Sequence, residues 1–171
     1  YDVQVNDGGV LRLGSGFGSL TGTPYTEDGV QKTGNTILLN GGGVLGMLDA
    51  DWSNENEMVV NAGGKAFVLD TTGYDPDSMT ASGDSHVMTL NGTVKSGGAS
   101  GTIIVKNGNA GKNGRVVLGA ANTWDGVYQV TDHAARELAG AGASVNTLNS
   151  SSLSDISVAV TARTGAASST V

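Results

Sequence analysis

One short phrase recurs three times in this sequence, and it limits the possible folds more than any other feature. The phrase is an apolar residue, Asn, any residue, two glycines and then alternating apolar positions, and it starts at Val5, Leu39 and Val60. Asn and Gly reach positive φ at low cost, so the centre of each phrase is expected to be a tight turn or corner. The apolar residues on both sides alternate as they do in β-strands. We therefore expect a fold built by stacking strand–turn–strand units.

The phrases are unequally spaced along the chain. Asn6, Asn40 and Asn61 are followed by a weaker match at Asn91-Gly92, and the three intervals differ. A regular solenoid keeps a nearly constant repeat length. The phrase is therefore interpreted as a marker of corners or hairpin turns, and a hairpin is expected at Asn91-Gly92.

The remaining segments also have the pattern of short strands. The run from Thr102 to Lys106 is the most β-prone, and almost no segment favours helix. Asp132 is a candidate N-cap for one short helix near residues 133–139. The predicted fold class is all-β, either a β-helix or solenoid or a β-sandwich of short strands with Asn-Gly turns, and a barrel also fits the pattern. The predicted organisation is a β-rich core domain over 1–132, a flexible Ala/Gly/Ser segment over 133–153, and a C-terminal strand and tail over 154–171.

Charge and composition argue against two classes of partner. The chain has 9 Lys and Arg residues against 16 Asp and Glu residues, a formal net charge of −7. The basic residues are scattered, whereas a nucleic-acid-binding surface needs a basic stripe, so no nucleic-acid partner is expected. No run of about 18 apolar residues occurs, so no membrane insertion is expected. The chain has no cysteine and only 15% charged residues, which together are typical of the bacterial cell surface or the extracellular space.

Residues 117–130 carry a resemblance to a known family. An apolar residue and Gly are followed by Asn-Thr-aromatic, one further residue, Gly and a strand that contains Val. These places are taken by Leu118, Gly119, Asn122, Thr123, Trp124, Gly126 and Val130. The segment resembles the autotransporter-associated β-strand repeat. The resemblance implies a right-handed β-helix in a secreted bacterial surface protein with a structural or adhesive role.

The sequence contains no recognisable catalytic motif. Its two histidines, His86 and His133, are both interpreted as exposed loop or cap residues rather than as catalytic groups. A phosphate-binding loop, a nucleophile elbow and a zinc-protease helix motif are all missing. The protein is therefore predicted not to be an enzyme and to need no cofactor.

Two pairs of carboxylates are candidate metal ligands. Asp49 and Asp51, and likewise Asp75 and Asp77, stand two residues apart in predicted loops. Such a spacing begins many Ca²⁺ sites, which need six to eight oxygen ligands. The alternative is that these residues form turns, a common role of Asp in loops.

The C-terminal segment suggests self-assembly. Residues 154–163 form an alternating strand behind a flexible stretch, and such a strand can complete the sheet of a neighbouring subunit. Head-to-tail addition of this kind builds a filament, whereas the alternative is that the strand folds back onto its own sheet. The predicted inserting face is Ile156, Val158 and Val160, and the predicted receiving edge includes Val3 and Val5.

These observations predict a non-enzymatic structural subunit of a secreted bacterial surface fibre or adhesive layer. Its expected partners are copies of itself in a head-to-tail polymer, with glycans or host surfaces as further partners. The alternative is a β-helix that binds or cleaves a polysaccharide. Asn91 and Asn149 also match the acceptor pattern for N-glycosylation.

Overall fold

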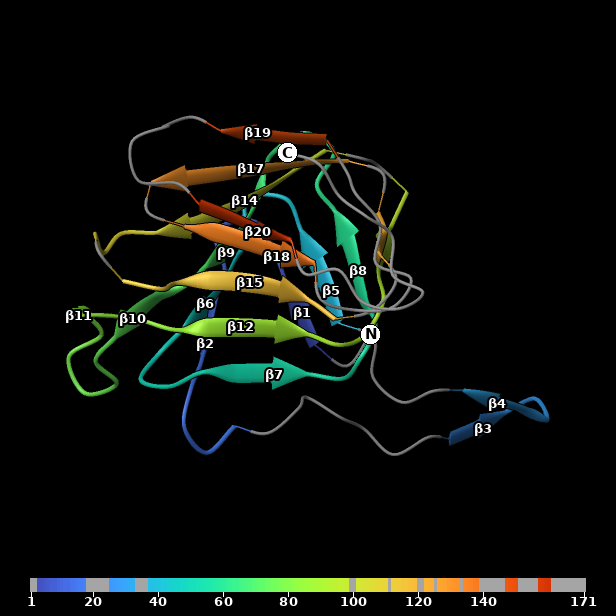
Figure 1. Ribbon diagram of the computed structural model, residues 1–171. Helices are drawn as coiled ribbons and strands as arrows, with labels where there is room; N and C mark the ends of the chain where they lie inside the picture. The colour runs from blue at the N-terminus through green and yellow to red at the C-terminus, as the bar shows by residue number, and fades with distance from the viewer. Residues whose placement is uncertain are drawn as a thin grey trace.

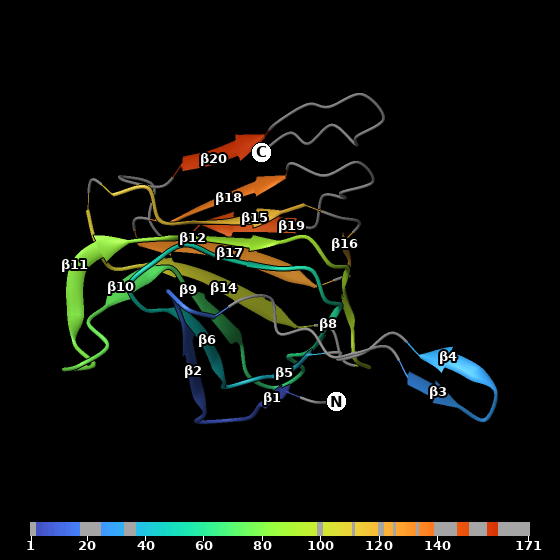
Figure 2. The same ribbon diagram turned by 90° about the horizontal axis from the view of Figure 1, so that it is seen from below.

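In the computed structural model, strands of successive turns of the chain stack into three parallel sheets, which form the faces of a solenoid (Figures 1 and 2). The structure describes residues 3–17, 25–32, 37–98, 101–110, 112–119, 122–124, 126–132, 134–138, 147–150 and 157–160. Sheet I consists of β1 (Val3–Val5), β5 (Ile37–Asn40), β8 (Met58–Asn61), β13 (Val94–Ser96) and β16 (Asn122–Thr123). Sheet II consists of β2 (Val10–Leu13), β6 (Val44–Met47), β9 (Phe67–Asp70), β14 (Thr102–Asn107), β17 (Val127–Asp132) and β19 (Thr147–Ser150). Sheet III consists of β7 (Trp52–Asn54), β12 (Val87–Leu90), β15 (Arg115–Leu118), β18 (Ala135–Leu138) and β20 (Ser157–Val160).

The chain visits sheets I, II and III in turn, and each turn of the chain adds one rung to the stack. β5, β6 and β7 form such a rung, and β13, β14 and β15 form another. Neighbouring strands within each of the three sheets are parallel and in register. The all-β prediction is confirmed, and the strands stack as a solenoid.

The recurring Asn phrase forms the corner between sheets I and II. The N–H of Gly9 donates to the carbonyl of Asn6 at 2.8 Å, and Gly43 donates to Asn40 at 3.1 Å. The glycine before each donor has a positive φ, 76° at Gly8 and 84° at Gly42. An i to i+3 bond with positive φ at the third residue is a type II turn, which explains Gly8 and Gly42 in the first two phrases.

The unequal spacing of the phrases results from insertions and does not argue against a solenoid. The antiparallel hairpin of β3 (Tyr25–Glu27) and β4 (Val30–Lys32) interrupts the first rung, and it stands away from the sheets in Figures 1 and 2. A second antiparallel hairpin, β10 (Thr72–Tyr74) and β11 (Ala81–Ser85), lies between β9 and β12. The three full phrases, at Asn6, Asn40 and Asn61, therefore mark the same corner of successive rungs, whose lengths differ.

Two local predictions were wrong because tertiary pairing overrides them. Asn91-Gly92 is a corner between β12 and β13, which lie in different sheets, and not a hairpin. Ala135–Leu138 is strand β18, paired with β15, and not part of a helix. β18, β19 and β20 extend sheets II and III beyond residue 132, whereas residues 139–146 and 151–156 lie outside the described residues.

Aliphatic side chains in register fill the interior of the solenoid. Leu45, Leu69, Val105 and Val130 form one such row across β6, β9, β14 and β17, and all four are buried. Stacked rows of this kind remove apolar surface from water at roughly 25 cal/mol per Å², which is the main stabilising contribution of the fold.

Candidate functional site

The solenoid ends in an open edge at its N-terminal end. β1 is the outermost strand of sheet I and β2 the outermost strand of sheet II. Among the described residues, each pairs with a strand on one side only. Such edges present unpaired N–H and C=O groups and are templates for pairing with another strand. A hollow of about 390 Å³ lies between these strands and is lined by Val3, Gln4, Val5, Asn6, Asp7, Gly9, Val10 and Leu11.

The two residues predicted for the receiving edge, Val3 and Val5, lie on this edge strand. Val5 is 3% exposed and belongs to the protein's own core, whereas Val3 is partly buried. The edge therefore offers the backbone of β1 rather than the side chain of Val5. Ile37 N–H donates to the carbonyl of Glu57, toward β8. In a parallel ladder the backbone N–H and C=O groups of successive residues point to opposite neighbouring strands. The backbone groups of Leu38 therefore point to β1, and those of its neighbour in register, Gln4, point to the outer edge of the sheet.

An ion pair joins the first rung, which contains β2, to the third rung, which contains β9. Arg12 Nη2 lies 3.0 Å from Asp70 Oδ2, and the two side chains are 10% and 5% exposed. The guanidinium also stacks on Tyr74, at 3.4 Å from the ring centroid. Gly46 lies between the partners in register, and a Cβ there would come within 2.5 Å of Arg12 Nη1. The glycine therefore makes room for a charged side chain to cross the second rung.

A second ion pair repeats this arrangement at the corner. Lys65 Nζ pairs with Asp7 across Gly42, where a Cβ would clash with the Asp7 carboxylate. Both side chains are more than half exposed, so this pair contributes little to stability. It does fix the position of Asp7 at the rim of the hollow.

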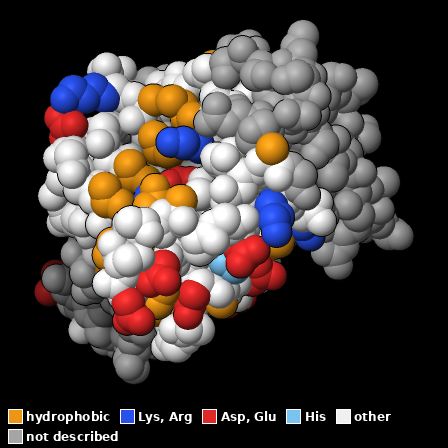
Figure 3. Space-filling model, turned by 90° about the vertical axis from the view of Figure 1, so that its left-hand side faces the viewer, with side chains coloured by type: hydrophobic (Ala, Val, Ile, Leu, Met, Phe, Trp, Pro, Cys, Tyr) orange, Lys and Arg blue, Asp and Glu red, His pale blue; other side chains and the backbone are white. Residues whose placement is uncertain are grey.

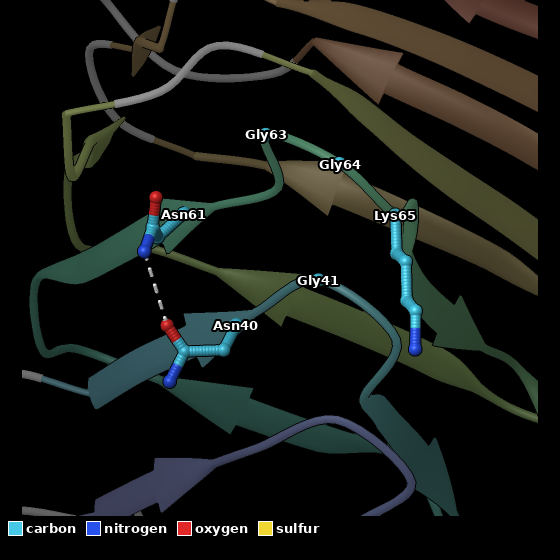
Figure 4. Close-up of a pocket in the computed structure, with 6 residues that line it drawn as sticks. All are labelled: Asn40, Gly41, Asn61, Gly63, Gly64 and Lys65. Atoms are coloured by element: carbon cyan, nitrogen blue, oxygen red, sulfur yellow. Dashed lines mark hydrogen bonds between the residues drawn. The ribbon is translucent and has the colours of Figure 1, made fainter.

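The asparagines of the recurring phrase form a ladder along the corner. Asn40 Nδ2 donates to Asn6 Oδ1 at 2.7 Å, and Asn61 Nδ2 donates to Asn40 Oδ1 at 3.4 Å. Beside the ladder lies a shallow groove of about 300 Å³ (Figure 4), lined by Asn40, Gly41, Asn61, Gly63, Gly64 and Lys65. The sequence identified these asparagines as turn residues but did not predict that they bond to one another. The only signal for the ladder was that the phrase recurs.

Loss of the middle asparagine is expected to cost more than loss of the terminal one. Asn40→Ala removes two ladder bonds and should lower the free energy of unfolding by about 2 kcal/mol, against about 1 kcal/mol for Asn61→Ala. Urea unfolding followed by circular dichroism measures both values. Equal losses in the two variants would contradict a role for the ladder in stability.

Asp49 and Asp51, the first pair of candidate calcium ligands, accept hydrogen bonds from residues distant in the chain. Asp49 Oδ2 accepts from Ser15 Oγ at 2.5 Å and Asp49 Oδ1 from Ser15 N–H at 2.8 Å. Asp51 Oδ1 accepts from the N–H of Val87 at 2.8 Å, and it lies 3.6 Å from His86 Nδ1. Within the described ranges, no three His, Cys, Asp or Glu side chains gather at a position that would hold a metal ion.

The second pair, Asp75 and Asp77, lies in the loop between β10 and β11. Asp75 Oδ1 accepts from the N–H groups of Ser78 at 3.0 Å and Asp77 at 2.8 Å, and these two bonds hold the pKa of Asp75 below its ordinary value. Asp75 therefore stabilises the turn, as the alternative interpretation of the sequence proposed.

Hydrogen bonding to Ser15 holds the pKa of Asp49 below its ordinary value, the side-chain bond having the larger effect. Ser15→Ala is therefore expected to raise the pKa of Asp49 toward 3.8. Because the folded pKa is the lower one, the stabilisation is present above the unfolded pKa and is lost as the pH falls through the folded pKa. NMR titration of the Asp49 carboxyl carbon checks this. An unchanged titration midpoint in Ser15→Ala would show that the hydroxyl does not act on Asp49.

The remaining predicted residues lie at other positions of the solenoid. Asn91 Nδ2 donates to Glu55 Oε1 at 2.6 Å, and Asn149 lies in β19. β20 is the outermost strand of sheet III, where Val158 and Val160 pair in register with residues of β18. The C-terminal strand thus pairs with its own chain. Ile156 and His133 lie outside the described residues.

The segment that carries the family resemblance runs from the end of one rung into the next. Leu118 ends β15, Asn122 and Thr123 form β16, and the 1% exposed Trp124 follows at the next corner. The Trp124 ring meets the Tyr128 ring edge to face, with centroids 5.0 Å apart. A Cβ on Gly126 would clash with the indole. The glycine and the aromatic residue of the motif are therefore a packing pair.

The arrangement defines the class of this protein as a parallel β-solenoid of three sheets. No family model, no curated protein and no solved structure matches the chain. No helix among the described residues is long and apolar enough to cross a membrane.

Proposed function

We propose that this protein is a non-enzymatic structural subunit of a secreted bacterial surface fibre or adhesive layer, whose copies join head to tail by β-strand addition. The observation that supports the proposal is the N-terminal end, where no described strand pairs with the outer edges of β1 and β2, which border a hollow. Strand addition at such an edge uses main-chain hydrogen bonds, and specificity comes from the side chains beside it.

The opposite end of the stack supplies the complementary edges. Among the described strands, β16, β19 and β20 are the outermost ones of sheets I, II and III at that end. All pairs within the three sheets are parallel, so one copy placed on another with the same axis direction continues the same ladder. Repeating this contact does not close, and it therefore builds a filament. In this scheme β20 contributes its free edge while it stays paired with β18 of its own chain.

Blocking the N-terminal edge is expected to prevent filament growth. Gln4→Pro removes the N–H that faces the free edge without removing a bond to β5, since Gln4 does not face that strand. Filament length in negative-stain images should fall at least tenfold in this variant. Gln4→Thr keeps the N–H and favours strand, so it should assemble like the wild type.

The C-terminal edge is tested by Val158→Asp, which places a charge in the outermost strand of sheet III. We expect this variant to stop growth from the other end, so that a mixture with Gln4→Pro also forms no long filaments. Wild-type protein that stays monomeric at high concentration would reject strand addition. Normal filaments from Val158→Asp would remove the C-terminal strand from the interface.

The alternative function is recognition or cleavage of a polysaccharide, and the groove beside the Asn ladder is the feature that favours it. Its carboxamides and Lys65 are groups that hydrogen-bond sugars. Glycan platforms are commonly aromatic, however, and Trp52, Trp124 and Tyr128 are buried in the solenoid. A glycan array with wild-type protein and Asn61→Ala separates this function from assembly.

A further inference from the structure

A row of β-branched side chains runs along the outer face of sheet II. Val10, Val44, Val68 and Ile104 are neighbours in register across β2, β6, β9 and β14. Val10 is 58% exposed, and the other three are half-buried. Figure 3 views the molecule from this side and shows hydrophobic side chains gathered in a band, with charged side chains around it.

Apolar residues at these positions are not needed to build the core. The next residue on β6, β9 and β14, namely Leu45, Leu69 and Val105, points inward and is buried, and the next residue on β2, Leu11, packs against the core. A sheet with one face in water normally alternates apolar and polar residues. The four strands from β2 to β14 are instead apolar on both faces along this row, which indicates that a partner covers the outer face.

The surroundings of the row are almost neutral although the protein is acidic. On one side Asp7 pairs with Lys65, and on the other Arg12 pairs with Asp70. The two ion pairs are neutral, and Lys106, in register with Asp70, brings the net charge of these five residues to +1. The whole chain carries −7. When two copies of an acidic protein meet, electrostatic repulsion is smallest where the nearly neutral surface of one copy contacts the same surface of the other.

We propose that this row is a lateral docking surface for a second copy of the same chain, row against row. The side chains repeat at the strand spacing of about 4.8 Å, and a second copy presents the same repeat. Short β-branched residues at this spacing interdigitate when two sheets pack face to face. The contact uses the flank of the solenoid and not its ends, so it is independent of head-to-tail addition.

A crosslinking experiment tests the contact directly, because the chain has no cysteine of its own. Val44→Cys places one thiol in the row, and Ser53→Cys places one on the exposed outer face of β7. Packed sheets lie about 10 Å apart, beyond the reach of a disulfide, so a short bismaleimide is the linker. Both cysteines are placed in the Gln4→Pro background, which blocks the end contact. We expect at least tenfold more covalent dimer from Val44→Cys than from Ser53→Cys.

Sedimentation velocity gives a second readout without a linker. In the Gln4→Pro background, Val68→Glu should weaken dimerisation at least tenfold, and Ser53→Glu should leave it unchanged. Circular dichroism checks that both variants fold. Protein that sediments as a monomer at every concentration, or a folded Val68→Glu variant that dimerises normally, would overturn the lateral contact. Neither result depends on whether the wild type forms filaments, so the two proposals fail separately.

Discussion

Replacing Arg12 by Leu is expected to lower the free energy of unfolding by about 3–5 kcal/mol, because it leaves Asp70 buried without its cation. Asp70 is 5% exposed, so water cannot replace the guanidinium. The remaining bond to its carboxylate is from the N–H of Thr72 at 3.1 Å. Guanidinium unfolding curves of the variant and the wild type measure the difference.

The double variant Arg12→Leu with Asp70→Leu is the matched control. A buried ion pair replaced on both sides by apolar residues costs far less than one that has lost a single partner. We therefore expect the double variant to be more stable than Arg12→Leu alone by at least 2 kcal/mol. A double variant that is less stable than either single variant would show that the side chains, and not the charges, determine the packing there.

Replacing Phe67 by Ala is expected to cost about 3–5 kcal/mol, since it opens a cavity at the corner of sheets I and II. Phe67 is fully buried, and its ring lies over Gly43, where a Cβ would be 3.0 Å from Phe67 Cε2. The recurring phrase thus ends in glycine at this rung partly because an aromatic ring of the next rung occupies the space. Thermal and urea unfolding measure the loss.

The reciprocal change tests this explanation. Gly43→Ala overpacks the same space and should cost about 1–3 kcal/mol. In the double variant Gly43→Ala with Phe67→Leu, the smaller side chain leaves room for the new methyl group. The double variant should therefore lose less stability than the sum of the losses of the two single variants. The gain is partial because a Cβ on Gly43 also lies 2.9 Å from the carbonyl of Asn6. Strict additivity would show that Gly43 and Phe67 are not coupled.

Local signals in the sequence predicted the strands and the corners well. Period-2 apolar runs and the Asn-x-Gly-Gly phrase have local causes, namely alternation of side chains and the low cost of positive φ at Gly8 and Gly42. The predicted helix failed where local signals compete with pairing. Residues 135–138 have helix-favouring side chains, but in the fold they pair with β15 as strand β18.

The candidate site was predictable only in part. Val3 and Val5 were recognised as a terminal strand, and the structure places that strand at an open edge. The ion pairs beside it were not predicted. Arg12 and Asp70 are 58 residues apart, and Lys65 and Asp7 are separated by the same interval. No local pattern links residues at such a distance.

The sequence by itself determined that the chain is all-β, where it turns, and that Asn and Gly occupy the turns. Only the tertiary structure decided which turns stack, because the strands that pair are separated in the chain by whole rungs and by inserted hairpins, and no local pattern shows which of them become neighbours. The register of the paired strands aligns Asn6 with Asn40 and Asn61, carries Arg12 across Gly46 to Asp70, and joins four separate aliphatic residues into one outward row. Stacking converts positions that are distant in the chain into neighbours about 4.8 Å apart.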